Sequence, residues 1–231
     1  MDFSGKHVVI TGGTGALGSA VVGALLDAGA QCHVPFRSAA EVDRFPHKDS
    51  HRVKLYPGVE LADEAAVGKL YAGISPLWAS IHLAGGFAMK PLAESSKADI
   101  MGQIETNLVS AFLCCRAAVN AMGKTGGRIV NVAARPALEP RTGAGMTAYT
   151  ASKAGVAALT TSLAEEVAKN GILVNAVAPS IMDTPANRKA MPKANFDAWP
   201  KVEEVAATIL FLASPDNKVT RGAIVPVYGK S

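Results

Sequence analysis

Short apolar runs alternate with longer segments of helical period along the whole chain. The short runs are almost continuously apolar, whereas the longer segments place apolar residues three and four positions apart. Strands that are apolar throughout are buried on both faces, which is typical of a parallel sheet covered by helices on each side. The expected strands are His7–Ile10, Gln31–Phe36, Val53–Tyr56, Ala79–Leu83, Arg128–Ala133, Ile172–Ala178 and Ala223–Tyr228. The expected helices are Ala16–Ala28, Asp63–Tyr71, Ala98–Met122, Ala148–Lys169 and Val202–Leu212.

No linker, repeat or low-complexity stretch interrupts this alternation. The pattern therefore predicts a single doubly wound α/β domain over residues 1–231, with a mainly parallel seven-stranded sheet. The least regular segment runs from Pro179 to Pro200 and contains four prolines. Ligands of such sheets bind beyond the carboxyl ends of the strands, so we expect this excursion either to cover a substrate or to be only a structural loop with one short helix.

The composition excludes several classes of protein. The chain has 231 residues, 49% hydrophobic and 18% charged, which is typical of a globular protein with a sizeable core. Its net charge of +4 comes from scattered lysines and arginines, so we expect no nucleic-acid partner. The longest apolar stretch, Val205–Ala213, is too short to span a membrane. Three cysteines and five histidines show no disulfide or metal-ligand spacing, so we expect no metal and a cytoplasmic location.

A glycine-rich motif joins the first expected strand to the first expected helix. In TGGTGALG, residues 11–18, Gly13, Gly15 and Gly18 satisfy G-x-G-x-x-G. Glycine lets pyrophosphate approach the backbone at a helix N-terminus, where free N–H groups favour an anion. The strand before and the helix after favour a Rossmann-type dinucleotide site over a glycine-rich turn without a ligand. The candidate binding residues are Gly12, Thr14, Gly15, Ala16, Leu17 and Gly18.

The end of the second expected strand indicates the cofactor. NAD-binding proteins place a carboxylate there for the ribose 2′-hydroxyl, whereas an arginine accommodates a 2′-phosphate. This chain has Phe36 followed by Arg37, without a carboxylate. The sequence therefore favours NADP(H) over NAD(H), although an exposed surface arginine would give the same pattern.

A tyrosine and a lysine four residues apart open the fourth expected helix. Tyr149 and Lys153 lie on the same helix face because residues i and i+4 are neighbours there. A phenol has a pKa of about 10, and a fixed cation beside it is expected to lower that pKa towards the range of a general acid. Many such pairs are ordinary surface residues, so the pair is informative only together with the glycine motif.

Together these motifs resemble the short-chain dehydrogenase/reductase family over essentially the whole chain. The resemblance implies a catalytic role for Asn107, in a helix-borne ETNL segment, beside Tyr149 as general acid/base and Lys153 as its partner. It also implies a small-molecule substrate and a homodimer or homotetramer. Further cofactor contacts implied by the resemblance are Glu60 and Leu61, Leu83, Ala84 and Gly85, and Pro179, Ile181 and Thr184, together with Tyr149 and Lys153 themselves.

The chain departs from the family where a catalytic serine is expected. Ala133 and Ala134 follow the fifth expected strand at that place. Alanine cannot donate a hydrogen bond to a substrate carbonyl, and Thr142 or Thr147 in the following loop would be the nearest replacements.

A narrower resemblance covers Asp183–Trp199, which is similar to the substrate-side segment of dihydropteridine reductase. That enzyme also lacks the serine and reduces a quinonoid dihydropterin. Phe196 and Trp199 would then either contact the substrate or pack the segment onto the sheet.

Two further classes remain open at this stage. A nucleotide-binding regulatory protein that has lost catalysis would explain Ala134, but not the presence of Tyr149, Lys153 and Asn107. A sugar-nucleotide epimerase would share the glycine spacing but usually has a longer C-terminal substrate domain. We therefore expect hydride transfer between a nicotinamide and a small carbonyl, quinonoid or imine substrate.

Overall fold

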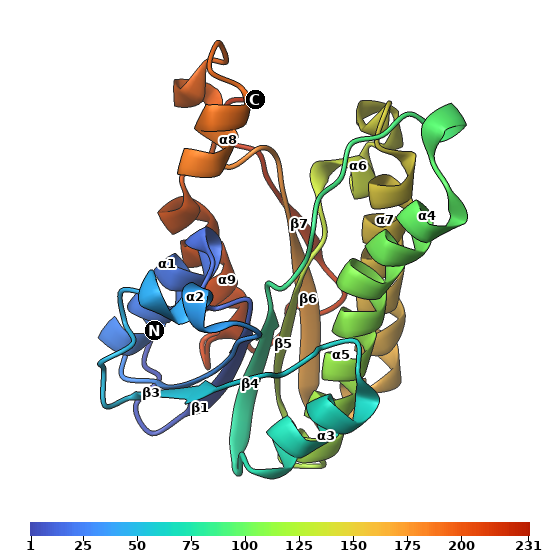
Figure 1. Ribbon diagram of the computed structural model, residues 1–231. Helices are drawn as coiled ribbons and strands as arrows, with labels where there is room; N and C mark the ends of the chain where they lie inside the picture. Colours follow the sequence, from blue (N-terminus) through green and yellow to red (C-terminus); the bar gives the residue numbers. More distant parts are fainter.

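Seven parallel strands form one sheet in the order β3-β2-β1-β4-β5-β6-β7 in the computed structural model, which describes residues 1–231 (Figure 1). This confirms the predicted α/β class and the parallel sheet. Each strand lies within two residues of its predicted bounds because the apolar runs are short and sharply delimited. The strands are β1 (His7–Thr11), β2 (Gln31–Pro35), β3 (Val53–Tyr56), β4 (Leu77–His82), β5 (Gly127–Val132), β6 (Ile172–Pro179) and β7 (Ile224–Val227).

Helices cover the sheet on both faces (Figure 1). One layer contains α1 (Ala16–Asp27) and α9 (Val202–Ala213), and the other contains α3 (Glu64–Ala72), α5 (Ser110–Met122) and α7 (Thr147–Glu166). Shorter helices lie at the ends of the strands. They are α2 (Ala39–Asp43), α4 (Lys97–Gln103), α6 (Arg135–Leu138) and α8 (Pro185–Ala190), with 3₁₀ turns at Leu92–Glu94, Pro140–Gly143, Ala168–Asn170 and Phe196–Ala198.

The two faces of the sheet belong to two separate apolar clusters. Along β1, Val8 and Ile10 pack in the cluster beneath α1 and α9, whereas Val9 packs in the cluster beneath α3 and α5. All three side chains are fully buried. A strand buried on both faces needs apolar residues at every position, which is why the strands read as continuous apolar runs. None of the helices is long and apolar enough to cross a membrane.

The structure corrects two expectations about the connections. The predicted helix Ala98–Met122 is helical throughout, but a π-helical turn, η2 (Ile104–Val109), lies between α4 and α5. The irregular segment after Ala178 contains two short helical pieces, α8 and Phe196–Ala198, where we expected one. Hydrophobic periodicity does not predict these short pieces, because each is less than two turns long or lies within a longer apolar pattern.

The strand order reverses at β1, whose neighbours are β2 and β4. We call the edge formed by the carboxyl-terminal ends of the strands the carboxyl edge, and the opposite one the amino edge. At the carboxyl edge, the Leu83 N–H donates to the Thr11 carbonyl at 3.1 Å. This contact joins the glycine-rich loop after β1 to the loop after β4. The candidate residues therefore gather at the switch point where doubly wound sheets bind ligands.

Candidate active site

The glycine-rich loop leaves the N-terminus of α1 free for an anion. Gly12 has φ +68°, and a Cβ atom added to it would lie 2.7 Å from the Ala84 nitrogen. Gly15 caps α1 without any side-chain hydrogen bond, and the first turn contains no acidic residue. The first N–H groups of the helix therefore lack side-chain partners, which suits a pyrophosphate. The geometry of this loop therefore fits the pyrophosphate of a dinucleotide.

The other predicted loop residues differ in what they expose. Thr14 Oγ1 donates to Glu41 at 3.1 Å, so its hydroxyl already has a partner. Leu17 is buried in the core, and a Cβ on Gly18 would collide with the Gly12 carbonyl. Leu17 and Ala16, the first residue of α1, can therefore offer a ligand mainly their backbone.

Arg37 and Glu60 face each other at the ends of β2 and β3. Arg37 Nη1 lies 3.7 Å from Glu60 Oε2, and the arginine side chain is 75% exposed. An ion pair this exposed contributes little to stability, so the guanidinium remains accessible to a second anion. Leu61, which the resemblance also implies as a cofactor contact, is half-buried.

Tyr149 and Lys153 occupy the first two turns of α7. The Tyr149 ring packs edge-to-face against Phe87, with ring centroids 5.0 Å apart. Lys153 is buried, and its Nζ donates to the Val132 carbonyl at 2.8 Å. Burial raises the pKa of Tyr149 to about 12 and lowers the pKa of Lys153 to about 8. The direction for Tyr149 is opposite to the one expected from the spacing, because desolvation of the phenol dominates.

Asn107 lies inside the π-helical turn and is also buried. Its Oδ1 accepts from the Gly86 N–H at 2.9 Å, and its Nδ2 donates to the Gly86 carbonyl at 3.0 Å and to Ser152 Oγ at 3.1 Å. A Cβ added to Gly85 would lie 2.7 Å from Asn107 Oδ1 and 3.3 Å from Lys153 Nζ. The fold therefore brings Asn107, Lys153 and the loop after β4 together around Gly85.

The place of the missing serine is a buried alanine. Ala134 is 5% exposed and precedes α6, whose first residue, Arg135, donates from Nε to Glu139 at 2.9 Å. Neither threonine considered as a replacement donor is shown to take this role. Thr142 donates its hydroxyl to the Glu139 carbonyl at 2.8 Å, and Thr147 is exposed at the start of α7.

The segment after β6 is tied to the body of the protein. Pro179 is buried at the end of β6, and Ile181 is 45% exposed. Thr184 is buried, and its Oγ1 accepts from the Asn187 N–H at 3.2 Å, so this residue caps α8. Trp199 is also buried, and its ring centroid lies 5.1 Å from that of Phe196. Of the two roles left open for these aromatic residues, the geometry favours packing of the segment.

Sequence reasoning missed a buried polar network directly beneath the site. His82 Nδ1 contacts Asn131 Oδ1 at 2.8 Å, and Asn131 Nδ2 donates to Thr160 Oγ1 at 2.9 Å. On its other side, His82 Nε2 contacts Ser80 Oγ at 2.8 Å. These residues link β4, β5 and α7 immediately below Leu83 and Val132. The polar residues within otherwise apolar strands were the signal available in the sequence.

Comparison with known proteins settles the family. The family model for short chain dehydrogenases matches residues 6–195. The chain belongs to the short-chain dehydrogenase/reductase family. Its relatives include galactitol 2-dehydrogenase of Rhizobium johnstonii, 34% identical over 96% of this chain and 93% of that protein. Cis-4-hydroxycyclohexanecarboxylate dehydrogenase of Sinomonas cyclohexanicum is 33% identical, over 98% of this chain and 96% of the relative. Most of the relatives are named dehydrogenases or reductases, which supports an NAD(P)-dependent oxidoreductase.

Solved structures agree with the fold and with a nicotinamide cofactor. ElxO with NADP bound has a TM-score of 0.88 and 27% identity, and the match covers 97% of each chain. A blue fluorescent protein from a metagenomic library, in complex with NADPH, has a TM-score of 0.89 and 26% identity, with full coverage of both chains.

Proposed function

We propose that this oxidoreductase is an NADP(H)-dependent reductase of small carbonyl, quinonoid or imine compounds, with Tyr149 as the proton donor. The observation that supports it best is the position of Tyr149 on α7, one turn before the buried Lys153, whose Nζ lies beside Gly85 together with Asn107 Oδ1. A general acid must hold its proton until the reaction requires it, and the raised pKa of Tyr149 agrees with that requirement. Lys153 and Asn107 are the polar residues that we expect to act together with this phenol.

Each residue has a distinct part in the proposed reaction. The nicotinamide, when bound, supplies the hydride. Tyr149 donates its phenolic proton to the substrate. Lys153, fixed to the Val132 carbonyl, places a positive charge in a buried site, and Asn107 fixes the loop after β4 through its two hydrogen bonds with Gly86. Thr184 and the backbone of Ile181 would lie beside the carboxamide.

Preference for NADP(H) is the second element of the proposal. It is supported by Arg37, by the absence of an acid at Phe36, and by relatives of similar structure that are described with NADP or NADPH bound. Glu60 is the one carboxylate paired with Arg37, and an approaching 2′-phosphate would compete with it for the guanidinium.

Removal of the phenolic hydroxyl tests the proton donor. Tyr149→Phe should lower turnover with NADPH by about 10²–10⁴-fold, because one positioned acid typically contributes that much. Affinity for NADPH, measured by fluorescence titration, should stay nearly unchanged. Lys153→Ala should reduce both quantities, because the ammonium is expected to contact the cofactor ribose as well.

A Tyr71→Phe variant is the matched control. Tyr71 is buried on α3, with its hydroxyl 2.7 Å from Ser80 Oγ, so Tyr71→Phe removes a phenolic hydroxyl that bonds to none of Tyr149, Lys153 and Asn107. We expect this variant to keep its turnover after correction for the folded fraction. Full activity of Tyr149→Phe would contradict the proposal.

Ala134 favours a quinonoid dihydropterin-like acceptor as a second, more specific candidate. One missing oxyanion donor typically costs about 10²–10³ in rate on substrates whose carbonyl oxygen gains negative charge. Conjugated imine or quinonoid acceptors spread that charge and can be protonated away from the hydride site, so they should lose less.

Restoring the hydroxyl tests this candidate. Rates on quinonoid dihydropterin should exceed those on simple ketones, and Ala134→Ser should raise the ketone rates selectively. Ketones as better substrates of the unmodified protein would rule out the dihydropterin candidate while leaving the reductase proposal in place.

A further inference from the structure

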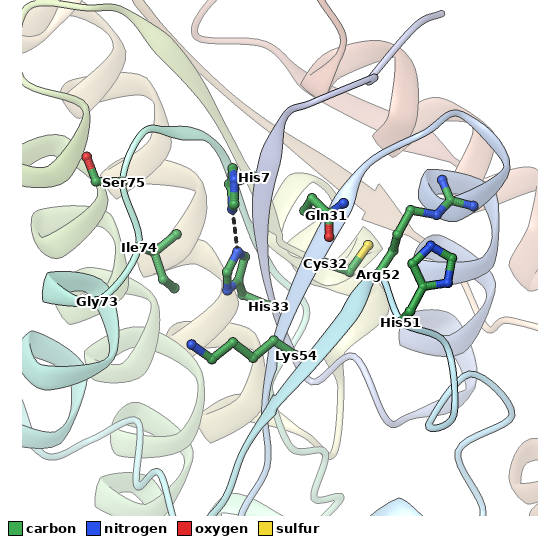
Figure 2. Close-up of a pocket in the computed structure, with 10 residues that line it drawn as sticks. All are labelled: His7, Gln31, Cys32, His33, His51, Arg52, Lys54, Gly73, Ile74 and Ser75. Carbon is green, nitrogen blue, oxygen red and sulfur yellow. Dashed lines mark hydrogen bonds between the residues drawn. The ribbon is translucent and has the colours of Figure 1, made fainter.

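Hydrogen bonds between side chains join separate elements of this fold at both edges of the sheet. Near the amino edge, the rings of His7 and His33 join β1 to β2, with 2.8 Å between two of their nitrogens (Figure 2). At the carboxyl edge, Asn107 and Ser152 join the π-helical turn to α7 at 3.1 Å. The proposed reaction uses Asn107 but so far gives Ser152 no part.

The donors and acceptors in the link between Asn107 and Ser152 are fixed. The Gly86 N–H can only donate and the Gly86 carbonyl can only accept, so their bonds to Oδ1 and Nδ2 set the orientation of the Asn107 amide. Nδ2 then donates to Ser152 Oγ, and Ser152 Oγ donates its single proton to the Tyr149 carbonyl at 2.7 Å. A continuous path of hydrogen bonds therefore leads from Gly86 to the backbone of the proposed proton donor.

The first turn of α7 contains Tyr149 and has no side-chain cap. Met146 is the N-cap residue, and it makes no side-chain hydrogen bond to the helix. The first N–H groups of such a helix lack side-chain partners, so its end is fixed less firmly. Ser152 is fully buried and Asn107 is 1% exposed, so water does not compete for the bond between them. This bond therefore ties an uncapped turn to a fixed part of the protein.

The ring of Tyr149 is held from the same loop as its backbone. Phe87 follows Gly86 directly and packs edge-to-face against the phenol, with ring centroids 5.0 Å apart. Asn107 fixes this loop through Gly86 and fixes α7 through Ser152. The position of a reacting group matters for the rate, because a displacement of about 1 Å can cost about 10²-fold.

We propose that Ser152 is a positioning residue of the reaction, which couples the position of Asn107 to that of the Tyr149 phenol. The inference rests on the proposed role of Tyr149 as proton donor. It gives the π-helical turn a second task, since the amide that fixes the loop after β4 also fixes the start of α7.

Ser152→Ala removes the hydroxyl and tests the proposal. Alanine favours helix, so the variant should fold. Turnover with NADPH should fall about tenfold or more, because the phenol loses one of its two anchors. Affinity for NADPH, measured by fluorescence titration, should stay nearly unchanged.

The same substitution in a Tyr149→Phe background separates positioning from a general structural role. Ser152→Ala should then have no further effect on the residual turnover, because Ser152 acts through the phenolic hydroxyl. Loss of turnover by the same factor in both backgrounds would overturn the proposal.

Thr160→Val is the matched control. Thr160 is buried on the same helix, accepts from Asn131 Nδ2 at 2.9 Å and donates to the Val156 carbonyl at 2.8 Å. It therefore makes the same kind of link as Ser152, but about two turns further from Tyr149. After correction for the folded fraction, this variant should keep its turnover.

The outcomes distinguish this inference from the proposed function. Full turnover of Ser152→Ala beside an inactive Tyr149→Phe would overturn the role of Ser152 alone, and so would equal losses in Ser152→Ala and Thr160→Val. Full turnover of Tyr149→Phe would refute the proton donor itself, and the role of Ser152 with it.

Discussion

Tyr149 and Lys153 have pKa values displaced in opposite directions by the same cause. Burial disfavours the charged form of each group. It therefore raises the pKa of the phenol and lowers the pKa of the ammonium. The Lys153 Nζ donates one of its hydrogen bonds to the Val132 carbonyl. In this arrangement Tyr149 holds its proton at neutral pH, as the proposed role of proton donor requires.

Arg37 is the residue on which cofactor preference should depend. Arg37→Ala should lower NADPH affinity by about 1.5–3 kcal/mol, the value of a charged hydrogen bond, and leave NADH affinity nearly unchanged. Arg44→Ala is the matched control, because Arg44 lies at the end of the neighbouring α2 and bonds only to the Ala40 carbonyl. Equal NADPH and NADH affinities in the unmodified protein, measured by fluorescence titration, would refute the preference.

At the scale of single residues, the sequence predicts which residues form the candidate site but not their protonation states. The i, i+4 spacing places Tyr149 and Lys153 on one helix face, and the glycine spacing predicts the loop after β1. The pKa values depend instead on burial, and the residues that pack around the pair, such as Phe87 and Val132, come from two other parts of the chain. No local pattern contains that information.

Among the elements, the π-helical turn at Ile104–Val109 has the largest effect on the site. This turn lies between α4 and α5, and it holds Asn107 against Gly86. The sequence predicts a single long helix there because one extra residue in a turn barely disturbs the apolar period. By contrast, the bounds of β3 match the prediction, since the run from Val53 to Tyr56 is sharply bordered.

Glycine substitutions in two elements should have opposite effects on stability. Gly12→Ala should lower the free energy of unfolding by at least about 2 kcal/mol, because φ is +68° and the new Cβ would press on the backbone of Ala84. Gly68→Ala on α3 should raise it by about 0.5–1 kcal/mol, because nothing lies within 4 Å of the added Cβ and alanine favours helix. Urea denaturation of the two variants measures both values, and equal stabilities would contradict the geometry of the loop.

At the scale of the whole molecule, two buried histidines should make stability sensitive to mild acid. Burial is the main cause that lowers the pKa of both His33 and His82 to about 4, against about 6.5 in an unfolded chain. Unfolded protein therefore takes up protons between pH 6.5 and 4 that the folded protein does not. The free energy of unfolding should have its full value above pH 7 and should decrease by about 2 kcal/mol for each ring by pH 5.

Urea denaturation at pH 7.5 and pH 5 in phosphate-free buffer checks this expectation. His33→Gln should show a smaller difference between the two pH values than the unmodified protein, whatever its absolute stability. An unchanged midpoint of unmodified protein between the two pH values would show that neither ring stays neutral on folding.

The order of the strands leaves β3 and β7 at the two borders of the sheet, and each border discourages another strand from joining. On β7, the Val227 carbonyl accepts from the Ser180 N–H, so the next residue back, Pro226, faces outward. Proline has no N–H to offer an incoming strand. On β3, the exposed Lys54 places a charge beside the border. Both are recognised defences against open-ended β-aggregation, so contacts between copies of this chain should form through side chains and helices rather than by extension of the sheet.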